Sequence, residues 1–376
     1  MGIRQSYLES MVNLFSGVYK NKTVLITGSS GFKGSWLSYW LSEMGANVIG
    51  FSKDIPTNPC HIKFLGEPYI NFTIGNVCNI IDLEKSLINN KIDLVFHLAA
   101  QPLVRYSYKN PVETFQTNVM GVVNILEVCK KYNSIKGIVI VSSDKCYENF
   151  EDNRSYNEND RVGGYDPYSA SKGCTELVVS SFRRSYFSEQ TFGAKHSFIL
   201  SSVRAGNVIG GGDWSEDRLI PDIVKNAANK VTTEIRNPMA TRPWQHVLEP
   251  LSGYLLIGQK IIEGDITVSD AWNFGPANEA TLPVIEVLKK ASQIWSAIFY
   301  ETPLQQDVLH EASLLRLDCK KANTQLNWHP VWDTNMAIEK AINWYKKFYN
   351  TGKINTETDL IDYVNDARKL NYVWTQ

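Results

Sequence analysis

Two short runs near the middle of the chain carry residue types that can oxidise or reduce a hydroxyl group. Tyr168 and Lys172 stand four residues apart, so in a helix they share one face, where the ammonium can lower the pKa of the phenol towards neutrality. Ser143 follows an apolar run and places a hydroxyl at the tip of a strand. Its neighbours Asp144 and Lys145 are two further charged residues that hydride transfer alone does not need. The set predicts a redox base with further acid–base chemistry beside it.

The elements that must position these residues alternate along the first half of the chain. Apolar strand-like runs and segments of helical periodicity follow one another, which is typical of β-α-β units on a parallel sheet. Several runs are apolar at consecutive positions, as expected for strands covered on both faces. We therefore predict an α/β fold with a doubly wound parallel sheet of the Rossmann type. The predicted strands cover residues 23–27, 47–51, 94–98 and 137–141, and the predicted helices residues 36–44 and 121–131.

A glycine-rich turn joins the first predicted strand to the first helix. Gly28, Gly31 and Gly34 recur at every third position. Gly28 permits a tight turn, Gly31 lets the backbone approach a pyrophosphate, and Gly34 allows close packing of helix on strand, while the helix N-terminus offers unpaired N–H groups. The alternative is an ordinary strand-to-helix turn. The context of strand, spacing and helix favours a dinucleotide site.

The composition excludes several classes of partner. The 376 residues include 38 Lys and Arg against 39 Asp and Glu, a net charge of -1, so no global field attracts nucleic acid or an anionic membrane. The six cysteines form no Cys-x-x-Cys pair, which predicts free thiols rather than a metal site or disulfides. No run resembles a signal peptide or a membrane span. We expect a cytoplasmic protein that needs no metal.

The regular alternation of strand-like and helix-like segments ends after the glycines at 210–212, and the segments that follow, which contain several Trp and Pro residues, are less regular. We predict a dinucleotide-binding domain at 21–210, with a later segment near 244–275 that crosses back to it. A smaller α+β substrate lobe follows at 211–353. An arm at 1–20 and a tail at 354–376 complete the expected organisation.

The glycine spacing after a threonine, together with Tyr168 and Lys172, resembles the extended branch of the short-chain dehydrogenase/reductase superfamily. The runs 31–37 (Gly-Phe-Lys-Gly-Ser-Trp-Leu) and 144–149 (Asp-Lys-Cys-Tyr-Glu-Asn) are similar to its nucleotide-sugar 4,6-dehydratases that act on CDP-glucose. The resemblance implies a 4-keto-6-deoxy sugar product for lipopolysaccharide O-antigen. It also implies a homodimer or dimer of dimers formed through helices in regions 121–131 and 168–183.

The resemblance further implies NAD as the cofactor. Asn76 stands where the family usually has Asp, and Ser52, followed by Lys53, stands where a carboxylate usually holds the adenosine ribose; NADP therefore stays open, with NAD favoured. The implied cofactor residues are Gly28, Ser30, Gly31, Phe32, Lys33, Gly34, Ser52, Asn76, Val77, Leu98, Ala99, Ala100, Gln101, Asn118, Tyr168 and Lys172.

The resemblance assigns a role to each catalytic residue. Tyr168 takes the proton of the C4 hydroxyl, Ser143 binds the developing ketone, and Lys172 holds the ribose of the cofactor. Asp144 is the acid at O6. Lys145 stands where glutamate is usual, and either removes the C5 proton or stabilises the enolate electrostatically. The alternative for Asp144 and Lys145 is a solvated ion pair on a loop.

The nucleotide sugar is the implied partner. Its candidate contacts are Arg105, Ser143, Asn207, Arg204, Arg218, Arg236 and Arg242. Arg236 and Arg242 are assigned to the pyrophosphate because guanidinium groups match phosphate oxygens in two-point contacts, and the alternative for each is an ordinary surface charge. For Arg105 an ion pair between the lobes is the alternative.

His97, His246 and the tryptophans at 214, 244 and 272 are expected to pack rather than to bind metal or substrate. Other functions left open are a 4,6-dehydratase or 4-epimerase for another nucleotide hexose or heptose, and a non-catalytic NAD-binding protein.

Overall fold

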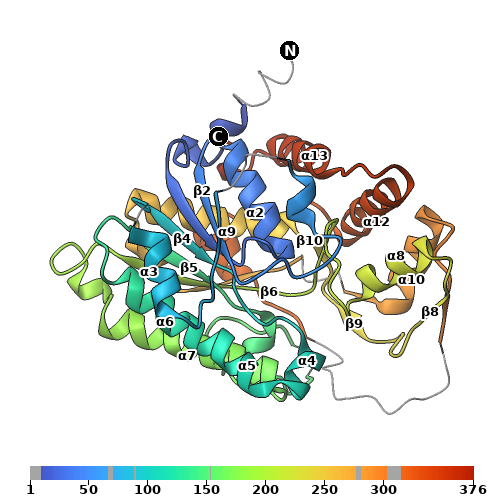
Figure 1. Ribbon diagram of the computed structural model, residues 1–376, viewed down its shortest axis with the longest axis horizontal. Helices are drawn as coiled ribbons and strands as arrows, with labels where there is room; N and C mark the ends of the chain where they lie inside the picture. Colours follow the sequence, from blue (N-terminus) through green and yellow to red (C-terminus); the bar gives the residue numbers. More distant parts are fainter. Residues whose placement is uncertain (1–9, 67–70, 89, 153, 277–280, 303–314) are drawn as a thin grey trace.

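The computed structural model describes residues 10–66, 71–88, 90–152, 154–276, 281–302 and 315–376. Residues 1–9 of the predicted arm lie outside the described residues. A seven-stranded sheet in the order β11-β6-β5-β4-β1-β2-β3 forms the centre of the molecule (Figure 1). Each neighbouring pair of its strands is parallel, which confirms the predicted fold class. The strands are β1 (Thr23–Thr27), β2 (Asn47–Ser52), β3 (Asn71–Ile74), β4 (Leu94–His97), β5 (Gly137–Val141), β6 (Ile199–Ala205) and β11 (Ala271–Phe274).

Alternate residues of each central strand enter two separate hydrophobic clusters, one on each face of the sheet. From β1, Val24 and Ile26 join the cluster that contains Trp36, whereas Leu25 joins the cluster that contains Ile125. Both faces are buried, which explains why these strands are apolar at consecutive positions. Helices α2 (Phe32–Glu43) and α9 (Leu248–Glu263) cover the first face, and α3 (Ile80–Ile88), α6 (Gly121–Cys129) and α7 (Pro167–Ser185) cover the second.

The carboxyl half of the chain contributes both to the sheet and to a smaller lobe. Helix α9 packs on β5, and β11 extends the sheet beside β6. The lobe holds helices and three two-stranded pairs to one side of the sheet (Figure 1). Its elements are α8 (Leu219–Ala228), α10 (Val284–Ile294), α12 (Thr334–Thr351), β7 (Val208–Ile209) with β10 (Gln245–His246), β9 (Thr241–Arg242) with β12 (Leu282–Pro283), and β8 (Thr233–Glu234) with β13 (Tyr300–Glu301).

The remaining helices are short or lie near the carboxyl end. They are α4 (Val104–Lys109), α5 (Pro111–Phe115), α11 (Lys320–Gln325) and α13 (Thr356–Lys369), with single turns η1 (Leu14–Gly17), η2 (His61–Phe64), η3 (Gln116–Met120), η4 (Asp144–Cys146), η5 (Glu189–Thr191), η6 (Ile266–Val268) and η7 (Val373–Thr375). No helix in the described part of the chain is long and apolar enough to cross a membrane.

The segment 354–376, which the sequence presents as a tail, is folded onto the dinucleotide-binding part. Trp374 is fully buried and stacks on Phe15 at 5.4 Å between ring centroids and on Tyr363 at 5.8 Å. His61 Nε2 and Thr356 Oγ1 lie 2.7 Å apart. The carboxyl end therefore belongs to the core that supports α2 and the glycine turn.

Candidate active site

The glycine turn lies between β1 and α2 and is too tight for side chains at two of its three glycines. Gly28 has φ +73°, and a Cβ there would lie 2.7 Å from the backbone nitrogen of Ala99. A Cβ at Gly34 would lie 2.1 Å from the carbonyl oxygen of Gly28. Gly31 is the extended residue before α2. The turn thus holds the N-terminus of α2 close to the ends of β1 and β4.

Two hydrogen bonds hold the end of β2 and the residues after it against the glycine turn. The backbone N–H of Ser30 donates to Oγ of buried Ser52 at 3.0 Å, and the Ser30 hydroxyl donates to the carbonyl of Asp54 at 2.7 Å. Lys53 is exposed and pairs with Glu113 at 3.2 Å. The only ammonium next to the ribose position is therefore already engaged by a carboxylate within the described residues.

Two segments that the sequence assigns to the cofactor are the loop directly after β4 and the turn η3, which carries Asn118. Leu98, Ala99 and Ala100 lie half-buried directly after β4, beside the glycine turn. Asn118 is buried, and its amide clasps the backbone of Gln101, accepting at 2.8 Å and donating at 3.1 Å. Its amide nitrogen also donates to Ser171 Oγ at 2.8 Å. Asn118 thereby holds the loop after β4 against α7, and its role towards the cofactor stays a prediction.

The Gln101 side chain also serves its own loop, because its amide donates to Thr114 Oγ1 at 2.9 Å and accepts from the Leu103 N–H at 2.6 Å. Near β3, Val77 is buried, and Asn76 uses its side-chain oxygen to accept the N–H of Cys78 at 2.9 Å. These contacts shape the rim of the site and leave backbone atoms to face a ligand.

Ser143, Asp144 and Lys145 lie at the carboxyl end of β5, where the single turn η4 begins. The Ser143 hydroxyl donates to Asp144 Oδ1 at 2.9 Å and accepts the N–H of Lys145 at 3.2 Å. Asp144 is buried, whereas Lys145 is half-buried. A Cβ on Gly206 would lie 3.3 Å from Asp144 Oδ2. Gly206 therefore lies directly beside the carboxylate, and because Asp144 is buried it is not part of a solvated surface pair.

Tyr168 and Lys172 lie in the first turns of α7, which begins at Pro167 and is capped by Asp166 accepting the N–H of Ser169 at 3.0 Å. Both side chains are buried. Burial raises the pKa of Tyr168 to about 12, although a hydrogen bond with Ser143 opposes the shift. Burial lowers the pKa of Lys172 to about 8. The expected lowering of the phenol pKa is therefore not present in the protein alone.

Lys33 adds a third cation to this cluster, which the sequence assigned only to the cofactor. Its Nζ lies 5.9 Å from the ring centroid of buried Tyr254. Burial, with the nearby Arg218 next, lowers the pKa of Lys33 to about 7, while Asp144 opposes that shift. Among the described residues the buried hydroxyl of Tyr254 has no hydrogen-bond partner. Its position inside α9 gave no signal in the sequence.

Arg204 does not reach a substrate. It is buried in β6, pairs with Glu176 of α7 at 2.8 Å and donates to the hydroxyl of Tyr147 at 2.6 Å. This corrects its assignment as a substrate residue, because its guanidinium lies beneath the catalytic segment and is engaged by buried groups.

Of the other arginines, Arg218, Arg236 and Arg242 belong to the lobe, whereas Arg105 lies on α4. Arg218 pairs with Asp213 at 2.7 Å and lies near enough to affect the pKa of Tyr168. Arg105 and Arg236 both pair with Asp217, at 3.4 and 3.2 Å, which is the ion pair between lobes that the sequence left open for Arg105. Arg242 is buried in β9.

Asn207 follows β6 and lies half-buried at the edge of the same region. A hollow beside Gly206 is lined by Pro243, Gly275, Thr281 and Arg316. The hollow lies near Asp144, because Gly206 stands beside the Asp144 carboxylate. Thr281 and Arg316 were missed by the sequence reasoning, because each lies far along the chain from any recognisable motif.

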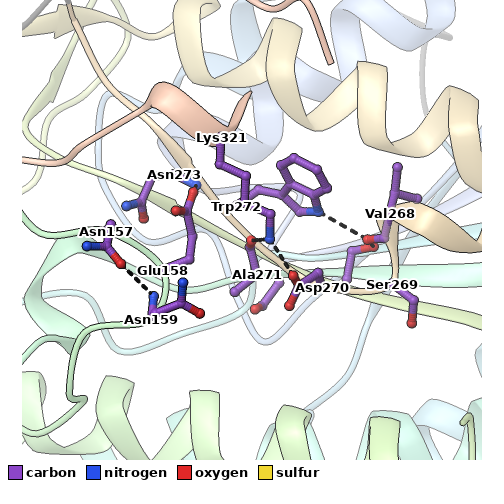
Figure 2. A network of polar contacts seen from close by, with 12 residues as sticks. Asn157, Glu158, Asn159, Val268, Ser269, Asp270, Ala271, Trp272, Asn273 and Lys321 are labelled. Atoms are coloured by element: carbon purple, nitrogen blue, oxygen red, sulfur yellow. Dashed lines mark hydrogen bonds and ion pairs between the residues drawn. The ribbon is translucent and has the colours of Figure 1, made fainter. Parts of the chain in front are cut away.

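The histidines and tryptophans singled out in the sequence pack as expected. His97 Nδ1 lies 2.9 Å from Thr27 Oγ1, and the His246 ring contacts Trp36 and Trp332 edge-on. Trp272 donates to the carbonyl of Val268 at 3.1 Å beneath the Lys321 ammonium (Figure 2). Among the described residues no cluster of His, Cys, Asp or Glu could hold a metal ion.

Comparison with known proteins accounts for this arrangement. The model of the family described as GDP-mannose 4,6 dehydratase matches residues 25–341. The chain belongs to this family. It is 47% identical over 329 residues to CDP-glucose 4,6-dehydratase of Salmonella typhimurium, covering 87% of this chain and 91% of the relative. CDP-paratose 2-epimerase of Salmonella typhi is 27% identical, with 85% and 98% of the two chains covered.

Solved structures share the fold of this family member. An epimerase of Methanothermobacter thermautotrophicus superposes with a TM-score of 0.77 at 22% identity, covering 92% of this chain and 96% of that one. The dTDP-glucose 4,6-dehydratase of Bacillus anthracis, solved with NAD, gives a TM-score of 0.70 at 22% identity, covering 87% and 97%. The doubly wound sheet and its lobe thus have the same fold as these two proteins.

Proposed function

We propose that this chain is a CDP-glucose 4,6-dehydratase that forms CDP-4-dehydro-6-deoxy-glucose. The 47% identity to the Salmonella dehydratase over 87% of the chain carries the proposal. The buried Asp144 supports it, because a carboxyl group near Tyr168 can act as the acid that loss of a hydroxyl requires and that epimerisation does not.

The glycine turn fits NAD. The cradle that a Cβ at Gly28 or Gly34 would fill lies at the N-terminus of α2, whose N–H groups suit a pyrophosphate. Lys33 lies in the first turn of that helix, and Lys172 suits the nicotinamide ribose. When bound, NAD accepts a hydride from C4 and returns it to C6.

Each proton transfer of the proposed reaction is assigned to a different residue. Tyr168 takes the proton of the C4 hydroxyl, with Ser143 donating to the same oxygen as it becomes a ketone. The ketone acidifies C5, whose proton Lys145 removes or whose enolate it stabilises. Asp144 protonates O6, so that water leaves. Arg218, Arg236 and Arg242 are the proposed phosphate contacts, together with Asn207, and Arg105 is proposed to lie beside the sugar.

The affinity for NAD should fall as the pH rises from about 7 to about 9. The pKa values of Lys33 and Lys172 are lowered by burial to about 7 and about 8, so both ammonium groups lose their charge in this range, and the loss of each charged hydrogen bond weakens binding about tenfold. Calorimetric titration at several pH values measures this. Lys33→Met should weaken binding and remove the step nearest pH 7; a flat profile in the wild type would refute the assignment.

The enzyme should prefer NAD over NADP by at least about tenfold. Ser52 is engaged by the glycine turn, and Lys53, which could hold a ribose phosphate, pairs with Glu113. Glu113→Gln frees Lys53 and should improve NADP binding without changing NAD binding. Equal affinity of the wild type for both cofactors, measured by the same titration, would contradict this assignment.

We also infer a homodimer. Exposed apolar side chains lie on α5, η3 and α7, where Val112 is 69%, Met120 48% and Leu177 60% exposed. Contiguous apolar surface of this kind marks an association site. Leu177→Glu should convert the dimer to a monomer in sedimentation experiments, whereas Leu370→Glu, which changes an exposed leucine outside this surface, should not. A wild-type monomer at micromolar concentration would exclude the dimer.

The cytoplasm is the proposed compartment. All six cysteines are free in the structure, and Cys60, Cys129, Cys146 and Cys319 are buried. Free thiols are typical of a reducing compartment. Titration of the denatured, freshly isolated protein should find six thiols; fewer would argue for an oxidising one.

A panel of CDP-, dTDP-, GDP- and UDP-glucose tests the proposed substrate. Alkali converts a 4-keto product to a chromophore, which should form with CDP-glucose in preference to the others. A product from another nucleotide sugar alone would reassign the substrate, and inversion at C4 without loss of water would make the protein an epimerase.

A further inference from the structure

A chain of buried polar groups lies directly beneath the proposed catalytic residues and is used by none of the steps above. Glu176 stands one helical turn after Lys172 on α7, and Arg204 stands on β6. They pair at 2.8 Å, and both are at most 5% exposed. The second guanidinium nitrogen of Arg204 donates to the Tyr147 hydroxyl at 2.6 Å. Tyr147 directly follows η4, the turn that carries Asp144 and Lys145.

The chain continues from Tyr147 into the edge strand of the sheet. The Tyr147 hydroxyl donates to Asn273 Oδ1 at 2.8 Å. The Asn273 side chain donates in turn to the carbonyls of Tyr156 and Asp318, at 2.9 and 3.1 Å, and its backbone N–H donates to Glu158 at 2.8 Å. Figure 2 shows Glu158 and Asn273 side by side at this end of the network. Arg204 also packs against the Tyr147 ring, 4.8 Å from its centroid. The segment after β5 is thereby anchored from below.

Stability alone does not explain a buried pair of this kind. Desolvation of two charges costs about as much as their attraction returns, so apolar residues of similar volume often serve a fold equally well. What an apolar pair cannot supply is a negative charge near Lys172. Burial lowers the pKa of Lys172, and Glu176 is the largest influence that raises it. Burial acts to raise the pKa of Glu176, but the attraction of Arg204, together with hydrogen bonds from Arg204 and Ser202 and the nearby Ser142 hydroxyl, outweighs it and keeps the pKa of that carboxyl below its usual value.

We propose that Glu176 and Arg204 are positioning residues of the reaction: Glu176 keeps Lys172 charged, and Arg204, through Tyr147, fixes the turn η4 that carries Asp144 and Lys145. The pair couples the redox helix to the dehydration segment. The inference rests on the proposed function for the second half only, because the charge of Lys172 can be read from cofactor binding.

Other ionisable groups face Lys172 and define what the experiment must control. They are Tyr168 on α7, Cys146 of η4, His97 of β4 and Lys33 of α2. His97 is held neutral, because burial lowers its pKa to about 3, and burial raises the pKa of the Cys146 thiol. Lys33 is the one group among them that titrates in the same range, so the Lys33→Met background isolates Lys172.

The first test is calorimetric titration of NAD against pH in the Lys33→Met background. Adding Glu176→Gln should move the remaining step in affinity, near pH 8, down by about one pH unit. Glu176→Gln leaves the Arg204 charge without a partner and can lower stability. The double variant Glu176→Gln with Arg204→Met removes both charges and should restore stability while keeping the shifted step. An unshifted step in the folded double variant would overturn the role of Glu176.

The second test uses Tyr147→Phe, which removes the hydroxyl between Arg204 and Asn273 and changes no charge near Lys172. Its NAD profile should match that of the wild type, whereas in single turnover with CDP-glucose the keto product should form about tenfold more slowly relative to C4 oxidation. Equal slowing of both steps would overturn the anchoring role. Absence of product from the wild type would instead count against the proposed function and leave the NAD titration as the test of Glu176.

Discussion

Replacing Asp144 by Asn is expected to stop loss of water while C4 oxidation continues. Asp144 is buried at the end of β5. Its carboxylate lies beside Gly206 and accepts a hydrogen bond from the Ser143 hydroxyl. Asparagine keeps this shape but cannot deliver a proton to O6, and general acid catalysis is worth about 10²–10⁴-fold in rate. In single turnover with CDP-glucose, the absorbance of reduced nicotinamide should rise and persist, and the 4-keto-6-deoxy product should not form.

Lys145→Met is the matched variant for the neighbouring role. It should likewise allow C4 oxidation and block dehydration, because its side chain lies next to Asp144 in η4 and lacks a function at C4. If either variant lost C4 oxidation and dehydration together, these two residues would serve the architecture of the site rather than the elimination of water.

Tyr168→Phe is expected to abolish both steps, with a fall in kcat of about 10³-fold or more. Tyr168 is the proposed base for the C4 proton, and phenylalanine cannot take that proton. In the protein alone burial raises the pKa of Tyr168 to about 12. Ionisation near neutral pH therefore requires positive charge close to the ring, which Lys172, Arg218 and a bound oxidised nicotinamide can provide.

Tyr165→Phe is the control for this variant. Tyr165 lies three residues earlier and is 76% exposed, so its loss should leave kcat within about twofold of the wild type. NAD affinity should be retained in Tyr168→Phe. Substantial dehydration by Tyr168→Phe would show that another residue is the base.

The sequence was sufficient where the signal is local. Strands β1 and β5 have the predicted bounds because their consecutive apolar residues are compatible with few other structures. The start of α7 at Pro167 followed from the same kind of local rule. The glycine turn was equally readable, since Gly28 and Gly34 owe their identity to backbone contacts around the turn itself.

The sequence failed where a partner lies far along the chain. Arg204 was taken for a phosphate ligand because nothing in its own strand reveals Glu176, 28 residues earlier on a helix. The hydrogen bonds of Asn118 to the backbone of Gln101 were likewise not predicted, because they form only once η3 packs beside the loop after β4. The burial of Trp374 against Phe15 joins the two ends of the described chain, and no local pattern predicts it.

The fate of the C4 hydrogen tests the central claim most directly. CDP-glucose that carries deuterium at C4 should be converted, and the product should be examined by NMR. An internal redox cycle predicts deuterium in the C6 methyl group of the 4-keto-6-deoxy sugar, delivered within one active site. Recovery of the label at C4 of an epimer, or its loss to solvent from a dehydrated product, would contradict the account.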